Sequence, residues 1–81
     1  MEITAEVLKS TYQRVEDLKK VRTESWAAWH VLNDLEQRDK EQGREHKRLF
    51  SIIDRLNYEI RANELYFKEL SRDFIKQIVE G

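Results

Sequence analysis

Cysteine and proline are absent from this chain of 81 residues, and glycine occurs only twice. The lack of cysteine excludes a disulfide framework and any thiol chemistry. Because proline and glycine are the usual signals for breaks between short elements, their scarcity favours long uninterrupted helices. A chain of this length forms one domain at most, and its own core lies near the lower limit for independent stability.

Long apolar runs and an excess of one charge are also missing. No apolar run approaches the length of a membrane span and no signal peptide precedes the first charged residues, so we expect a soluble, cytoplasmic protein with no membrane partner. The 15 lysines and arginines nearly balance the 16 acids, which gives a net charge of −1. Because nucleic-acid binding usually needs a basic excess on one face, nucleic acid is not the expected partner.

The sequence does contain two stripes of residues at alternating spacings of three and four. The stripe in the second half is strongly apolar and consists of Leu49, Ile53, Leu56, Ile60, Asn63, Phe67, Leu70, Phe74 and Gln77. The stripe in the first half is less apolar and consists of Leu8, Thr11, Val15, Leu18, Arg22, Ser25, Trp29 and Leu32. This heptad spacing places each stripe on one face of a helix. We therefore predict an all-α fold in which the stripes meet along a seam.

A polar span between the stripes indicates where the chain reverses. From residue 33 to residue 48 the only large apolar residue is Leu35, and Gly43 is the only internal glycine. Glycine commonly follows the last residue of a helix, so we place the turn at about residues 42–44. The alternative is one continuous helix through Gly43, since a single glycine costs only about 1 kcal/mol.

The predicted architecture is an antiparallel two-helix hairpin that resembles a coiled coil. It forms a single domain, residues 1–81, with a first helix over about 4–41 and a second over about 45–79. Thr4 is the expected N-cap of the first helix, because its hydroxyl can accept a bond from a free N–H group of the first turn.

A hairpin folded near Gly43 would place Arg22 opposite Asn63 on the seam. We interpret this pair as a core polar layer, which lowers stability but penalises shifted or parallel pairings more strongly. The other interpretation is an anion site in which Arg22 grips a carboxylate or phosphate inside the bundle.

Large side chains beside the seam predict further association. A two-helix hairpin leaves half of each core side chain exposed, so we expect two hairpins to dimerise into a four-helix bundle. Tryptophan and tyrosine often anchor such interfaces. The predicted interface consists of Tyr12, Trp26, Trp29, Phe50, Tyr66, Ile75 and Val79. The alternative is a recognition patch around the two tryptophans for a heterologous protein.

Residues for catalysis or for binding a metal are not evident. His30 and Asp34 have the spacing of two metal ligands, but no third ligand shares their face. The chain has no glycine-rich phosphate loop and no nucleophile elbow. Its many carboxylates fall into ordinary helical ion pairs such as Glu64–Lys68. We therefore expect neither an enzyme nor a cofactor or metal site.

The predicted function is a non-catalytic protein–protein interaction or oligomerisation module, acting as an adaptor, a chaperone-like protein or an inhibitor. Its expected partner is a second copy of the chain, with a heterologous protein as the other possibility. Two alternatives remain: a small dimeric helical regulator that binds nucleic acid, and an anion-binding or catalytic bundle centred on Arg22. A basic cluster at the predicted turn supports the first alternative only weakly, because neighbouring acids nearly cancel it.

Overall fold

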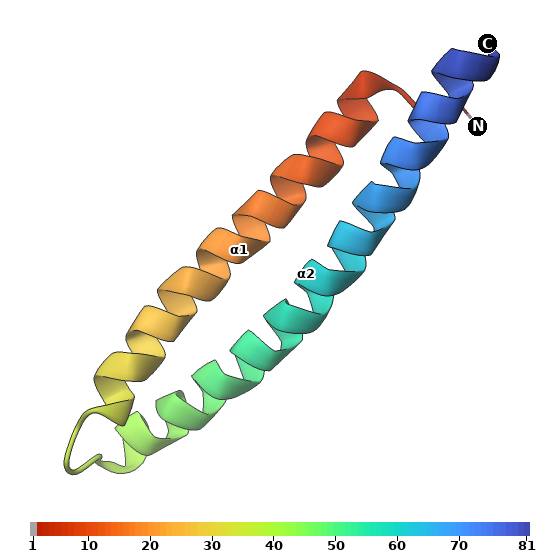
Figure 1. Cartoon of the computed structure of the whole chain (residues 1–81). Coiled ribbons are helices and arrows are strands. Elements are labelled where there is room, and N and C mark those ends of the chain that lie inside the picture. The colour runs from red at the N-terminus through yellow and green to blue at the C-terminus, as the bar shows by residue number, and fades with distance from the viewer. Residues whose placement is uncertain (1) are drawn as a thin grey trace.

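The computed structural model describes residues 2–81 and consists of two antiparallel helices (Figure 1). Helix α1 spans Ala5–Asn33 and helix α2 spans Lys40–Glu80. With 29 and 41 residues, the helices form a rod whose extents are 62 × 15 × 14 Å. The predicted all-α helical hairpin is confirmed.

Helix α1 begins at the predicted cap. The hydroxyl of Thr4 accepts a hydrogen bond from the backbone N–H of Val7 at 3.2 Å. Glu6 lies in the first turn, where its negative charge favours the positive end of the helix dipole.

The predicted turn at residues 42–44 is wrong, because the chain reverses earlier, in a loop over residues 34–39. Gly43 lies inside the first turns of α2. A capping box at Asp39 starts this helix: its carboxylate accepts from the N–H of Gln42 at 2.8 Å, and the Gln42 side chain accepts from the N–H of Asp39 at 3.1 Å. These two bonds satisfy backbone donors that a helix start leaves free, so α2 begins before the glycine.

The end of α1 is held by the same loop. Arg38 donates a hydrogen bond from its guanidinium to the backbone carbonyl of Leu32 at 3.0 Å. The backbone N–H of Asp34 bonds to the carbonyl of His30 at 3.0 Å. Both bonds satisfy carbonyls in the last turn, which explains why α1 stops well before the predicted residue 41.

The earlier reversal shifts the pairing of the helices along α2 by about one heptad. Arg22 bonds to Asn57 rather than lying opposite Asn63. Near the loop, the side chain of Asn33 bonds to His46, and near the open end Tyr12 packs on Phe67. A shift of about seven residues brings the same type of heptad position back to the seam, so the stripes still face each other.

The buried core is small and lies in the middle of the rod. It consists of Val15 from α1 and of Ile53, Leu56 and Ile60 from α2. Ile53 and Ile60 are each only 2% exposed, whereas the other seam residues are mostly half-buried.

The open end is closed by Gln77, which lies at the end of the α2 stripe. Its side-chain oxygen accepts from the backbone N–H of Ile3 at 3.0 Å, and its side-chain nitrogen donates to the carbonyl of the same residue at 2.8 Å. One amide group therefore pairs with a segment of extended backbone and fixes the start of the chain against α2.

We expect Ile60→Ala to lower the free energy of unfolding by about 2–4 kcal/mol, because it opens a cavity in the small core. Ile60→Val, which removes one methyl group, should cost about 1 kcal/mol. Val31→Ala serves as the control, since Val31 is 66% exposed, and should change stability by less than about 0.5 kcal/mol. Urea titrations followed by circular dichroism at one protein concentration measure all three values.

Gly43→Ala should raise the free energy of unfolding by about 0.5–1 kcal/mol, because alanine favours a helix more than glycine does. A Cβ at this position would meet no atom within 4 Å, and the glycine does not have a positive φ. The same urea titration provides the measurement. A loss of stability instead would support the turn that the sequence predicted, in which Gly43 adopts the left-handed conformation.

Candidate interaction surfaces

The predicted polar layer of Arg22 and Asn63 does not form. Arg22 donates to the side-chain oxygen of Asn57 at 2.9 Å. Asn63 donates to the backbone carbonyl of Glu59 in its own helix at 2.7 Å, which satisfies its amide without a partner from α1. The prediction failed because it rested on the wrong register.

The surroundings of Arg22 also bear on the predicted anion site. Arg22 lies in a groove that is also lined by Asp54, Arg61 and Glu64. The two carboxylates balance the two guanidinium groups, so the groove does not concentrate positive charge as an anion site requires.

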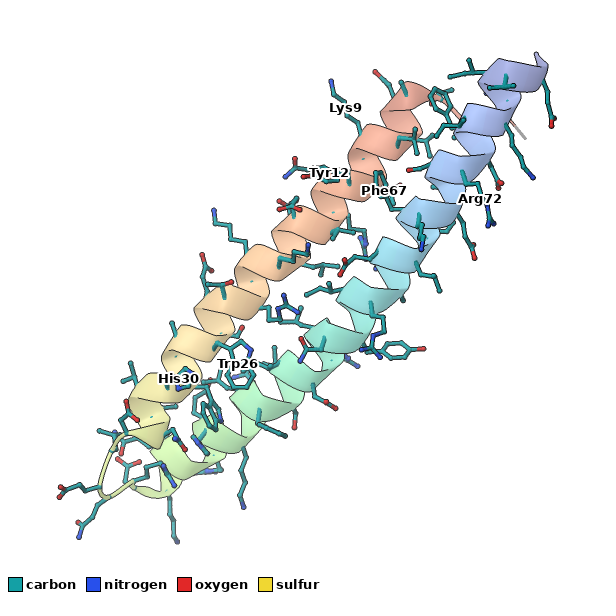
Figure 2. The ribbon with its side chains drawn as sticks, viewed as in Figure 1. Lys9, Tyr12, Trp26, His30, Phe67 and Arg72 are labelled. Carbon is teal, nitrogen blue, oxygen red and sulfur yellow. The ribbon has the colours of Figure 1, made fainter. Side chains whose placement is uncertain are left out.

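Four aromatic side chains form a cluster near the loop: Trp26, Trp29 and His30 of α1, and His46 of α2. The imidazole of His46 stacks on Trp29 with ring centroids 5.0 Å apart, and the edge of one indole meets the other at 5.3 Å. His30 stacks on Trp26 at 5.7 Å, and Figure 2 shows these two side chains together on α1. The cluster joins the helices at the loop end of the stripes, and Trp29 belongs to the stripe of α1.

Trp29 lies in the seam, as its place in the first stripe predicts, and within this cluster; its role in an intermolecular interface stays a prediction. Its indole N–H is buried without a hydrogen-bond acceptor. An unpaired buried donor costs about 1–3 kcal/mol, so stacking on His46 and packing against Trp26 must offset that cost.

One side of the seam carries four large side chains, which we call the aromatic flank: Tyr12, Phe50 and Ile78 are exposed, and Trp26 is half-buried. Tyr12 of α1 and Glu64 of α2 line the same groove. Trp26 lies two heptads from Tyr12, and both Phe50 and Ile78 lie two heptads from Glu64. Residues separated by two heptads share a side of a helix, so all four lie on the same side of the seam as this groove.

The aromatic flank is open to solvent along most of its length. Tyr12, Phe50 and Ile78 are 52%, 56% and 63% exposed. Tyr12 covers one side of Phe67, as Figure 2 shows, and its ring centroid lies 5.7 Å from that of Phe67. The middle of the flank is polar, with Lys19 facing Glu64 across the groove.

The remaining predicted interface residues lie elsewhere. Tyr66 lies on the opposite side of the seam, the side that also carries Val7 and Val21. Ile75 and Val79 belong to a second row on the outside of α2. The predicted set is therefore divided among the seam, its two sides and the outside of α2.

Sequence reasoning missed this second row, which we call the outer row: Tyr58, Arg61, Leu65, Lys68, Arg72, Ile75 and Val79. Its spacing again alternates between three and four residues, so these side chains share one face of α2. The spacing was visible in the sequence, but the three cations gave the row the appearance of an ordinary solvated face.

Other kinds of site receive no support from the described residues. Within residues 2–81, no three side chains among histidine, aspartate and glutamate are placed to hold a metal ion. Neither α1 nor α2 contains a stretch long and apolar enough to cross a membrane.

Comparisons with known proteins add no relative. No family model matches the chain, and no match is found among curated proteins or solved structures.

A double-mutant cycle tests the register of the two helices, in which Arg22 pairs with Asn57. We expect Arg22→Ala and Asn57→Ala to couple by about 0.5–1 kcal/mol, because each removes the partner of the other. Arg22→Ala and Asn63→Ala should instead add to within about 0.3 kcal/mol. Urea titration of the five variants and the parent chain measures both couplings, and the opposite ranking would favour the register predicted from the sequence.

Proposed function

We propose that this chain is a non-catalytic protein–protein interaction module that self-associates, with two hairpins forming a four-helix bundle through their aromatic flanks. The single observation that carries this proposal is the amount of surface left open by one hairpin. Among residues 2–81, only four side chains are buried in its core. The large side chains that remain exposed beside the seam are of the kind that anchors interfaces.

The accessible surface area of one hairpin can be compared with that of a compact protein of the same mass. The hairpin exposes 6836 Å². A compact monomer of 9.9 kDa would expose about 5,200 Å². The difference, about 1,600 Å² for one copy, is about twice the 800 Å² that each partner buries in an interface of standard size. Burial of the aromatic flanks of two copies would remove much of this excess from water.

The polar content of the flank supports a specific contact rather than a general apolar one. Lys19 and Glu64 lie in its middle, between the apolar ends formed by Trp26 with Phe50 and by Ile78. Charges inside an interface that is otherwise apolar restrict how two copies align, because a misaligned copy leaves them unpaired.

Sedimentation equilibrium over a wide concentration range tests self-association. We expect the parent chain to reach twice its monomer mass of 9.9 kDa. Phe50→Ala should weaken the dimer at least about tenfold, which corresponds to about 1.4 kcal/mol. Tyr66→Ala is the matched control, because Tyr66 is 54% exposed and Phe50 is 56% exposed, and it should change the dissociation constant less than about threefold.

Circular dichroism on the same samples verifies that each variant keeps its helices. A parent chain that stays monomeric up to about 1 mM would refute self-association, since its affinity would then be weaker than about −4 kcal/mol. A larger effect of Tyr66→Ala than of Phe50→Ala would show that the opposite side of the seam forms the interface.

A further inference from the structure

The outer row lies on the side of α2 that faces away from α1. The seam side of α2 is occupied by Ile53, Leu56 and Ile60, which are buried against α1. The four apolar members of the outer row are among the most exposed large side chains of the molecule: Tyr58 is 76%, Leu65 59%, Ile75 60% and Val79 78% exposed. Figure 2 shows Arg72, from the same row, pointing away from α1.

The charge of the row has one sign. Arg61, Lys68 and Arg72 stand between the apolar members, and no acid occupies a position of the row. Among residues 2–81 the salt bridges are Lys19–Glu16 and Arg48–Glu45, so these three cations carry no ion pair, and the predicted Glu64–Lys68 pair does not form. Three acids lie close by: Asp54 comes four residues before Tyr58 in the same spacing, and Glu64 and Glu69 line shallow grooves beside the row, but within residues 2–81 none of them forms a salt bridge with the three cations.

We infer that the outer row is a docking surface for an acidic amphipathic helix of a different protein. Such a helix places apolar side chains at the same spacing of three and four against Tyr58, Leu65, Ile75 and Val79, as helices pack along a seam. Its carboxylates beside that stripe pair with the three cations. The inference rests on the proposed interaction role, but it uses residues that are not part of the aromatic flank.

A second copy of this chain does not have the chemistry to fill this surface. Two outer rows facing each other would bring Arg61, Lys68 and Arg72 of each copy together, and like charges in an interface are unfavourable. The outer face of α1 does carry acids, at Glu16, Asp17 and Glu24. Between residues 9 and 27, however, its exposed outer positions hold no large apolar residue.

The arrangement of the row also distinguishes a helix from other anionic surfaces. A helix that lies on a membrane keeps its cations beside a continuous apolar stripe, so that the stripe can enter the lipid. Here the cations interrupt the stripe. Against nucleic acid, Leu65, Ile75 and Val79 would find no apolar partner, and Tyr58 is the only aromatic residue available for stacking.

Fluorescence anisotropy with two synthetic peptides tests the inference on the full chain. The acidic probe is a labelled helix of four heptads with leucine at both core positions and glutamate at the flanking positions, and the basic probe replaces each glutamate with lysine. We expect the chain to bind the acidic probe at least about tenfold more tightly than the basic one. Equal affinity for the two probes would overturn the proposal.

Reversing the charges of the outer row tests whether the acidic probe binds there. The triple variant Arg61→Glu, Lys68→Glu and Arg72→Glu should weaken binding of the acidic probe at least about tenfold and reverse the preference between the probes. The matched control reverses three exposed cations of the other helix, Lys9, Arg14 and Lys20 of α1, and should change the affinity less than about threefold. An equal loss in the two triples would indicate general attraction and would overturn the assignment.

The apolar half of the row has its own test. Leu65→Gln should weaken binding of the acidic probe by about fivefold to tenfold and leave the unfolding free energy nearly unchanged, since Leu65 is exposed. Phosphatidylserine vesicles and duplex RNA test the other anionic partners. The assignment to a helix would be overturned if the parent chain bound one of these but not the acidic probe, and if the outer-row triple lost that binding. Sedimentation of the same triple separates the two proposals, because dimerisation through the aromatic flank does not need the outer row.

Discussion

The meeting of two heptad stripes along the seam is the constraint on which the rest of this molecule depends. A single helix of either sequence would leave an apolar stripe in water, and pairing removes both stripes at once. The seam also determines what remains outside. Because each helix turns one face to its neighbour, the sides of the seam and the outside of α2 become distinct surfaces with different compositions. Their separation follows from the position of Ile53, Leu56 and Ile60.

The hairpin itself could be predicted from the sequence, whereas its register could not. Heptad spacing repeats, so a pairing displaced by seven residues brings the same types of position together and buries a similar stripe. Local hydrogen bonds in the loop determine which of these registers forms, above all the bonds between Asp39 and Gln42. That capping box was present in the sequence as an acid followed three residues later by glutamine, but Gly43 was given more weight. The error of about one heptad then moved Arg22 from Asn63 to Asn57.

The surfaces outside the seam could be predicted only in part, because some of them depend on the register of the two helices. Large side chains one position from the seam, such as Tyr12 and Phe50, can be assigned to a side by counting in sevens, and both are exposed in the structure. Trp29 could not be assigned in this way, because its environment depends on His46, and that neighbour depends on the register. The outer row has a regular spacing but alternates apolar and cationic side chains. Composition alone does not separate it from a solvated helix face.

The bonds between Gln77 and Ile3 have a consequence for geometry beyond the hairpin. They hold the start of the chain beside the end of α2, so both chain ends lie at the end of the rod opposite the loop (Figure 1). Any segment attached to either terminus would leave from that same end, and the loop lies at the other end of a rod 62 Å long. The rod therefore has a base, where residue 3 and the end of α2 meet, and a tip formed by the loop, and an attachment at the base would leave the tip uncovered.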